Sequence, residues 1–473
     1  MCYDSCTTGR KEYFTAVTNF SCINKFMFLC LYITSGVHIM KNLIPIIGFM
    51  TLPVFFAEGV RAQNNHQATL ASSILKDSHL DTIQSRALQL LTGLSAGTSY
   101  GEVWIRDFNT FINGSLQVLP RDTIKDMLLL FFRMQGDEGD IVDGVIRKDK
   151  ANVAYKYRYS DRAPGWAAHK NTVETDQESS LIQAVRKYVV ATGDQSVLFL
   201  SLSDKTILQR MEWALEYLLK ERWSEKYGLI TGATTIDWGD VQPENGWGVA
   251  INEKTKWAID IYDNAMFVIA IQDFLAMKPA TYKPTRNWNQ VAAGIRKNVR
   301  KYLWEPATQK YIPHLYLNGS PFSPSFNEKE ILYTGGSACA VLAGFHSKAE
   351  IAAINKQMTQ AAAKEKFATI GITVYPPYPA QEYPNMHPYV YQNAGDWTWF
   401  GGRMIQALIK NGFIQEAVDE LKPMTDRVIA HNGFYEWYDV QTGKPKGSGD
   451  FRGEAGVLLD AITLLKKWAA GHQ

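Results

Sequence analysis

Apolar residues recur every three or four positions over most of the chain beyond residue 64, which is the spacing of helices that bury one face. Asp204 and Gly412 stand where a helix start and a helix break are expected. Strand-like alternation is sparse and is confined to Lys310 to Tyr316 and Phe367 to Tyr375. The pattern predicts helices over residues 68–95, 121–136, 176–193, 204–222, 259–276, 286–303, 337–345, 347–363, 397–411, 413–430 and 452–469.

These helices are joined by short and long loops in turn, with no fixed repeat and no obvious linker. The economical architecture is therefore an all-α domain over residues 64–473, in which helical hairpins close into an (α/α)6 barrel. An open helical solenoid is the alternative that periodicity alone leaves standing.

The first 63 residues have a different character. A short basic start at Met40 precedes the apolar run Leu43 to Ala57 and a small-residue end near Gln63, the pattern of a secretory signal peptide. Residues 1–39 then resemble a misassigned start, or else carry a second hydrophobic stretch from Phe26 to Ile33. A membrane anchor is the competing interpretation, but Pro45 and Pro53 interrupt the run, which is shorter than the ~20 residues that span a bilayer. We expect a periplasmic or secreted bacterial protein without stable membrane insertion.

Cysteine usage and charge narrow the class of protein. Four of the five cysteines precede residue 64, so the mature chain keeps only Cys339 and has no disulfide framework. The formal net charge is +2, which offers no electrostatic footprint for nucleic acid. Neither zinc-protease nor P-loop spacing is present, so the sequence requires no metal and no cofactor. It indicates no oligomeric state.

Carboxylates set among aromatic rings stand out in two segments. Thr235 to Asp240 contains Asp237, Trp238 and Asp240, and Tyr435 to Asp439 contains Glu436. An apolar wall raises the pKa of one carboxyl so that it holds a proton near neutral pH, while a more solvated carboxylate stays ionised and activates water. This division of labour is what the cleavage of a glycosidic bond needs.

Further acids precede or begin predicted helices. Arg106 and Asp107 lie inside the apolar hexapeptide 103–108, which indicates either a structural ion pair or contact with a ligand. Glu174, Asp176 and Glu178 begin the helix predicted over 176–193, where acids also complement the helix dipole.

Aromatic residues are abundant, with 13 Trp, 23 Tyr and 22 Phe. Many stand beside polar residues in predicted loops, among them Trp257, Tyr378, Tyr383 and Trp397, where a ring can stack on the flat face of a sugar. A large core is the other explanation for any one of them. The loop 364–395, rich in Pro and Tyr, is expected to cap one end of a cleft and to favour exo-action.

Taken in order, these motifs carry a resemblance. The series consists of Trp-Ile-Arg-Asp-Phe at 104–108, an acid at the head of the 176–193 helix, a Trp-x-Asp loop at 238–240, Tyr-Gln-Asn at 391–393 and Glu-x-Tyr-Asp-x-x-x-Gly at 436–443. It resembles the (α/α)6-barrel glycosidases, including the neutral/alkaline invertases and the amylo-α-1,6-glucosidases of glycogen debranching. The likeness covers roughly residues 100 to 465 and does not identify one sugar.

The resemblance implies roles for particular residues. The Trp-x-Asp pattern makes Asp240 the proton donor, whereas the invertase-like Ile-Asp pattern selects Asp237, and Asp240 is preferred. Glu436 is the implied base. The implied substrate-binding residues are Trp104, Arg106, Asp107, Asp176, Trp238, Gln392, Asn393, Trp397 and Trp437, with Asp107 and Asp176 gripping hydroxyls and Arg106 orienting them.

The implied activity is that of an exo-acting, inverting glycoside hydrolase that cleaves α-glucosides or related α-linked oligosaccharides. Inversion predicts carboxyl groups roughly 6.5–9.5 Å apart, which leaves room for a water molecule. A glycoside phosphorylase on the same barrel and a non-catalytic sugar-binding protein are the alternatives, and a polysaccharide lyase is a weaker one.

Overall fold

The computed structural model describes residues 65–151, 156–244 and 250–473. His66–Gln473 forms a single unit. The predicted signal peptide and the domain boundary at residues 63–64 lie outside the described residues and stay predictions. Within the described ranges, no helix has both the length and the apolar character that crossing a bilayer requires.

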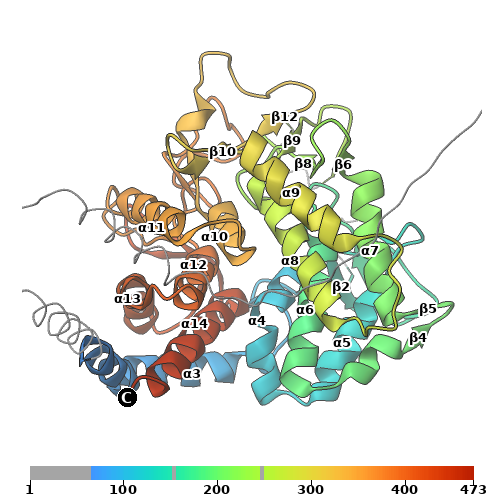
Figure 1. The fold of residues 1–473 in the computed structure, drawn as a ribbon, viewed down its shortest axis with the longest axis horizontal. Helices are drawn as coiled ribbons and strands as arrows, with labels where there is room; N and C mark the ends of the chain where they lie inside the picture. The colour runs from blue at the N-terminus through green and yellow to red at the C-terminus, as the bar shows by residue number, and fades with distance from the viewer. Residues whose placement is uncertain (1–64, 152–155, 245–249) are drawn as a thin grey trace, which may run out of the picture. The chain divides into compact units, whose positions relative to one another are not determined.

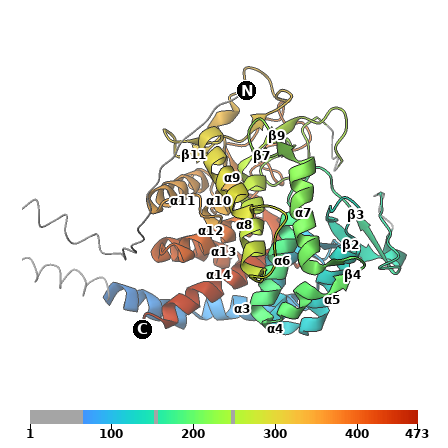
Figure 2. The same cartoon turned by 45° about the vertical axis from the view of Figure 1, so that its right-hand side comes forward.

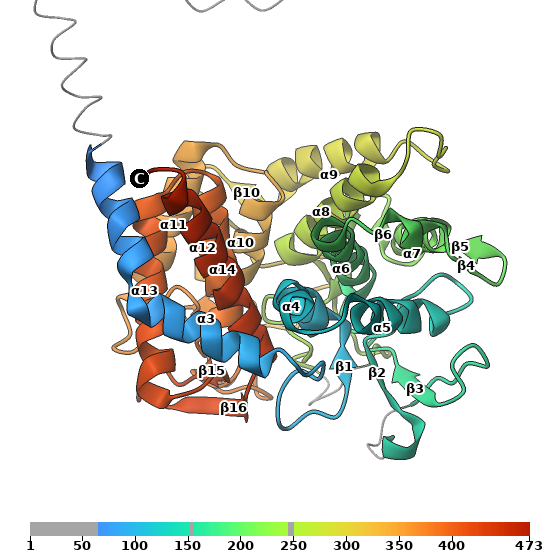
Figure 3. The same ribbon diagram turned by 90° about the horizontal axis from the view of Figure 1, so that it is seen from below.

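Six helices form an inner ring in which each helix packs against the next, and the last packs against the first (Figures 1 and 3). In ring order they are α4 (Ile105–Val118), α6 (Gln177–Thr192), α8 (Ile261–Met277), α10 (Thr334–Leu342), α12 (Thr398–Lys410) and α14 (Arg452–Ala470). The contact of α14 with α4 closes the ring, so the chain is a barrel and not an open solenoid.

The six helices that alternate with these along the chain lie outside the ring. They are α3 (Ser78–Leu90), α5 (Arg121–Arg133), α7 (Ile207–Glu221), α9 (Trp288–Tyr302), α11 (Lys348–Ala362) and α13 (Ile414–His431). Figure 2 shows the outer helix α3 beside α14, where the beginning and the end of the barrel meet. The predicted (α/α)6 barrel is therefore confirmed.

The connections between helices differ at the two ends of the barrel. A short link such as 411–413 follows an inner helix, whereas a long segment such as 134–176, 222–260 or 363–397 precedes one. The long segments gather at the N-terminal ends of the inner helices. They carry most of the short antiparallel strands, which are β1 (Val103–Trp104), β2 (Gly144–Arg147), β3 (Trp166–His169), β6 (Trp223–Ser224), β7 (Leu229–Ile230), β8 (Gly232–Ala233), β9 (Trp257–Ile259), β10 (Trp304–Glu305), β11 (Lys310–Tyr311), β12 (Leu315–Tyr316), β13 (Leu332–Tyr333), β14 (Val374–Tyr375), β15 (Tyr435–Tyr438) and β16 (Pro445–Gly449).

Two remaining short strands, β4 (Ser201–Leu202) and β5 (Lys205–Thr206), form a hairpin in the link that follows α6. Thr206 and Gln209 then form a capping box at the start of α7, so this helix begins at Ile207 and not at the predicted Asp204. The helix predicted over 68–95 is interrupted at Asp77, whose side chain caps α3.

Burial explains which helices the apolar pattern revealed. The outer helix α9 buries a single stripe of residues, namely Trp288, Ala292, Ile295 and Val299, which is the spacing of an amphipathic helix. Inner helices are buried on nearly all sides. Helix α4 was not predicted, because its buried residues include polar ones such as Arg106, Asn109 and Ser115 that hide the apolar period.

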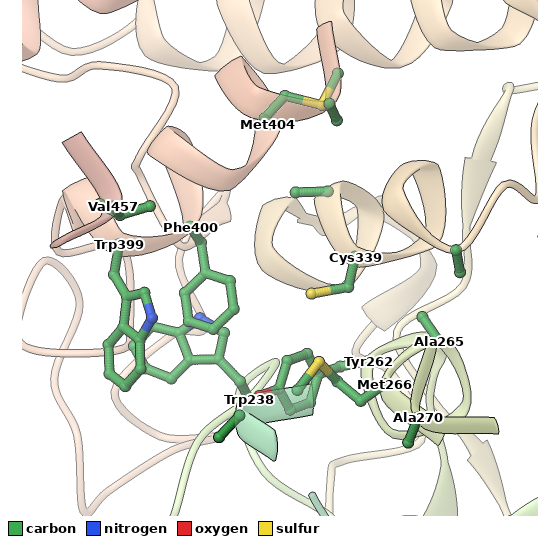
Figure 4. Packing of buried hydrophobic residues seen from close by; sticks show 14 of the residues in the cluster. Trp238, Tyr262, Ala265, Met266, Ala270, Cys339, Trp399, Phe400, Met404 and Val457 are labelled. Carbon is green, nitrogen blue, oxygen red and sulfur yellow. The ribbon is translucent and has the colours of Figure 1, made fainter. Parts of the chain in front are cut away.

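Inside the ring, large aromatic side chains fill the axis below the long connections. Trp238 stacks on Phe400 with ring centroids 4.5 Å apart, and Phe400 stacks on Trp399 at 5.5 Å (Figure 4). These rings come from one long connection and from the first turn of α12, and they support the polar layer that lies above them.

Candidate active site

A cavity of about 140 Å³ lies at the end of the barrel where the long connections meet the N-termini of the inner helices. Its volume is similar to the roughly 150 Å³ cavity that holds one benzene molecule, so it accommodates a single six-membered ring. The cavity is lined by Ala96, Tyr100, Trp104, Arg106, Asp107, Asp143, His169, Asn171, Glu174, Trp238, Asp240, Tyr391, Gln392, Trp397, Trp399, Glu436 and Phe451.

Asp240 lies on this wall, in the connection between β8 and β9, next to the buried ring of Trp238. Its Oδ1 atom is buried and has no hydrogen-bond partner among the described residues. Burial raises the pKa of Asp240, and the positive charge of Arg106 and the amide of Gln392 act in the opposite direction. A carboxyl with a raised pKa on the wall of a cavity is suited to donate a proton.

Glu436 reaches the same cavity from β15. Its Oε1 accepts hydrogen bonds from the hydroxyls of Tyr100 (2.9 Å) and Tyr391 (3.3 Å), and its Oε2 accepts one from the Ser448 amide (2.7 Å). Glu436 is 5% exposed, so it is not the well-solvated carboxylate that the sequence suggested. Burial raises its pKa, whereas the three hydrogen bonds favour the ionised form and so take the place of water.

Asp237 does not line the cavity. Its two carboxylate oxygens accept hydrogen bonds from the amides of Gly335 (2.7 Å) and Gly336 (2.8 Å), in the first turn of α10. Burial raises the pKa of Asp237 to about 7 against the lowering effect of these two bonds. The geometry thus contradicts a catalytic role for Asp237: this carboxylate satisfies the free amides of a helix N-terminus.

Arg106 and His169 are the basic side chains of the described wall, and the guanidinium of Arg106 is held by two acids. It makes a bidentate contact with Asp176 (2.7 and 3.0 Å) and an ion pair with Glu174 (3.0 Å). Tyr262 donates a further hydrogen bond to Asp176 at 2.5 Å. Asp176 is fully buried and away from the cavity, so it anchors Arg106 and does not grip sugar hydroxyls as predicted.

Asp107 and Asp143 face the cavity from α4 and from the turn before β2. Burial raises the pKa of Asp107 to about 8 and that of Asp143 to about 7. The Oδ1 atom of Asp107 is buried without a hydrogen-bond partner in the described part of the chain. His169 on β3 packs edge-on against Trp104, and burial lowers its pKa to about 4, which keeps the imidazole neutral.

Four tryptophans also line the cavity. Trp104, Trp238 and Trp397 were predicted site residues, and Trp399 lies two residues after Trp397. Trp437 lies behind it, with its ring 6.4 Å from that of Tyr391. Other predicted sugar-stacking rings belong to the core, because Tyr378 and Tyr383 are completely buried and pack on each other.

One residue of the Tyr-Gln-Asn motif lines the cavity with Tyr391, and the other has a structural role in the loop. Gln392 lines the cavity next to Asp240. Asn393 does not line it, because its side chain accepts a hydrogen bond from the Tyr378 amide and donates to the carbonyls of Tyr378 and Met386, which holds the loop together.

The lining residues that were not predicted include Tyr100, Asp143, Asn171 and Phe451. Each stands within a few residues of a short strand or an inner helix. Gly144, after Asp143, leaves room for the Trp104 ring, since a Cβ added there would lie 3.1 Å from that ring. For Tyr100 and Phe451, the position shortly ahead of an inner helix is the signal that a known barrel topology would have supplied. No group of three or more metal-ligating side chains is placed to hold an ion in the described ranges.

Neither a family model nor a curated protein matches the sequence. Solved structures do. The GH63 mannosylglycerate hydrolase from Thermus thermophilus superposes with a TM-score of 0.58 at 14% identity, covering 80% of this chain and 99% of that one. A rhamnosidase from Klebsiella oxytoca gives 0.53 at 13% identity, covering 81% and 63%. A GH78 rhamnosidase of Bacillus sp. GL1 gives 0.54 at 14%, covering 81% and 34%.

The fold is that of the (α/α)6-barrel glycosidases. The resemblance read from the motifs is thereby confirmed at the level of the fold, and function has to be argued from the site itself.

Proposed function

We propose that this protein is an exo-acting, inverting glycoside hydrolase that cleaves α-glucosides or related α-linked oligosaccharides. The observation that carries the proposal is that Asp240 and Glu436, nearly two hundred residues apart in the sequence, line one cavity together with aromatic rings. A pair of carboxyl groups on opposite sides of a sugar is the machinery of glycoside hydrolysis.

In this proposal Asp240 is the acid and Glu436 the base. Asp240 gives its proton to the glycosidic oxygen as that oxygen's bond to the anomeric carbon breaks. Glu436 takes a proton from a water whose oxygen bonds to the anomeric carbon from the other face. The hydrogen bonds from Tyr100 and Tyr391 support an ionised Glu436, and the raised pKa of Asp240 supports a protonated acid.

The size and charge of the cavity favour a neutral sugar at the end of a chain. About 140 Å³ holds one ring, and the wall carries five carboxyl groups against the single guanidinium of Arg106. The Thermus enzyme has been solved in complex with glucose and the Klebsiella enzyme with rhamnose bound, which supports a single sugar as the occupant.

The same charges disfavour the phosphorylase alternative. A phosphate would have to bind beside Glu436 in a cavity whose one guanidinium is already paired with Asp176 and Glu174. Binding a dianion there means placing it among carboxylates, which is electrostatically costly.

The deciding experiment is NMR of the anomer first released from a panel of α- and β-linked glucosides and mannosides, with and without inorganic phosphate. We expect the β-anomer to appear first from an α-glucoside, at a rate independent of phosphate. Retention of configuration would refute the inverting mechanism, and release of a sugar phosphate would establish phosphorolysis.

Glu436→Gln tests the base, with Glu416→Gln on the exposed face of α13 as its matched control. Glu436→Gln should abolish turnover and leave the unfolding transition unchanged, whereas Glu416→Gln should alter neither. Near-wild-type turnover of Glu436→Gln would remove Glu436 from the mechanism.

We also propose export to the periplasm or the medium, on the signal-like pattern ending near Gln63. Fractionation of cells that express the full chain tests this, and retention of an uncleaved chain in the cytoplasm would contradict it.

A further inference from the structure

A second cavity, of about 530 Å³, lies in the half of the barrel that faces away from the candidate active site. All six inner helices contribute to its wall, and it shares no lining residue with the first cavity. We call it the lower cavity. Its size is within the 300–1,000 Å³ range that is typical of small-molecule sites.

The lower cavity has an excess of basic groups. Arg186 and Lys187 on α6 and Arg403 and Lys410 on α12 line it, against two carboxyls, Asp273 and Asp460. None of the four basic side chains forms an ion pair with a carboxylate among the described residues. This is the reverse of the first cavity, where acids outnumber the one guanidinium.

Arg403 is the most constrained of the four. It is only 8% exposed, and its guanidinium lies 4.9 Å from the centre of the Phe400 ring. Within the described structure, its hydrogen bond to oxygen goes to the hydroxyl of Thr110 at 2.8 Å, and its other terminal nitrogen meets the sulfur atoms of Met266 and Cys339 at 4.0 and 3.8 Å.

An arginine stays charged in proteins and carries five N–H donors in a planar fork. Sulfur is a weak acceptor, so most of this donor capacity has no strong partner in the described structure. Burying a charge in this way is unfavourable unless something negative compensates it. Asp176, whose pKa the positive charge of Arg403 helps to lower, supplies part of this compensation without forming an ion pair with Arg403.

We propose that the lower cavity binds a small molecule bearing an oxyanion, a phosphate or a carboxylate, with Arg403 as its central contact. The guanidinium fork matches two oxygens of such a group. Lys187 and Lys410 supply further positive charge from neighbouring helices. This site is separate from the proposed glycosidase site and does not depend on it.

The two acids of the lower cavity do not cancel this preference. Burial raises the pKa of Asp273 to about 7, so its negative charge is weakened near neutral pH. Burial raises the pKa of Asp460 too, while the charge of Lys187 and a hydrogen bond from Asn113 at 2.8 Å act in the opposite direction. Burial also lowers the pKa of Lys187 to about 8, which leaves it mostly protonated at pH 7.

The alternative is that these basic groups only offset the negative ends of the six parallel inner helices. In that case they need no ligand, and the cavity holds water alone. The two explanations differ in whether a soluble oxyanion binds saturably and in which side chains its binding depends on.

The test is isothermal titration calorimetry of the whole protein with inorganic phosphate and, separately, with citrate, at pH 7 and constant ionic strength. The two probes distinguish a phosphate from a carboxylate ligand. We expect saturable binding of at least one of them with a stoichiometry of one.

Lys410→Ala and Lys467→Ala form a matched pair, because each removes an exposed lysine from the last turn of an inner helix and only Lys410 lines the lower cavity. We expect Lys410→Ala to weaken binding about tenfold, the effect of losing one charged contact, and Lys467→Ala to leave it unchanged. Arg403→Met should abolish binding. Because Arg403 is buried, this variant is also the one that is most easily misfolded, so the decisive comparison is between Lys410→Ala and Lys467→Ala.

Glu436→Gln should bind the probes as the wild type does, which separates this site from an anion site in the first cavity. The proposal is overturned if neither probe binds saturably, if Lys410→Ala and Lys467→Ala behave alike, or if binding changes with Glu436→Gln.

Discussion

Asp237 and Asp240 are three residues apart and both are candidates by motif, with Asp240 preferred, and the structure gives their carboxyl groups different contacts that a pair of matched substitutions can separate. Asp240→Asn removes a transferable proton from the cavity wall. General acid catalysis contributes about 10²–10⁴-fold, so turnover should fall by that factor, or roughly 3–5 kcal/mol in activation free energy. Because Oδ1 of Asp240 has no hydrogen-bond partner in the described structure, stability should hardly change.

Asp237→Asn should do the reverse. Asn keeps one acceptor oxygen for the amide of Gly335 or Gly336 and turns its NH2 toward the other, which leaves a buried N–H unpaired. An unsatisfied buried donor costs about 1–3 kcal/mol. The backbone tolerates the change, because Asp237 has a φ of 52°, a conformation in which Asn is also common.

The assay combines kcat/KM on the best substrate of the NMR panel with urea unfolding of both variants. Comparing a natural leaving group with an activated aryl glycoside adds a check, because a good leaving group needs little protonation. Asp240→Asn should therefore lose least on the aryl glycoside. If Asp237→Asn abolishes turnover at wild-type stability while Asp240→Asn stays active, the assignment is wrong.

Three further outcomes follow from the same site. Tyr100→Phe removes a hydrogen bond that lowers the pKa of Glu436, so the acidic limb of the kcat/KM profile should move to higher pH with about a tenfold loss of turnover; an unmoved limb would separate Tyr100 from the base. Gly447→Ala should reduce turnover at least tenfold, because the new Cβ would collide with Oε2 of Glu436 and because Gly447 has a φ of 69°, which alanine rarely adopts. Full activity of this variant would contradict the predicted collision. Asp107 has its folded pKa raised to about 8, so the protein binds its proton more tightly than the unfolded chain does and loses stability as pH rises from about 4 to 8. Asp107→Asn should remove that loss of stability and be more stable than the wild type at pH 8. Urea unfolding from pH 4 to 8 measures this, and an unchanged pH dependence would show that Asp107 is not the group responsible.

The outer helices α9 and α11 were predictable because apolar residues recur at helical spacing and a local cap marks the start. Helix α9 shows this with its buried residues at helical spacing, and α11 with the capping box of Ser347 and Glu350. These signals are local, so they can be read from the sequence without knowing which helices pack against the segment. The inner helix α4 has no such stripe, since it is buried on every side and carries polar side chains toward the cavity and the axis.

The sequence by itself determined that acids and aromatic rings meet in a few loops, and that helices dominate the chain. It led to Asp240, Glu436, Arg106 and Asp107 by residue type and order. Which of these face one cavity was decided only by tertiary structure, because the contacts of a carboxylate depend on segments far away in the chain. Asp237 meets the amides of α10 some hundred residues on, whereas Asp240 lies on the cavity wall. The ring closure of α14 on α4 brings Tyr100 to Glu436, a pairing that no local pattern contains.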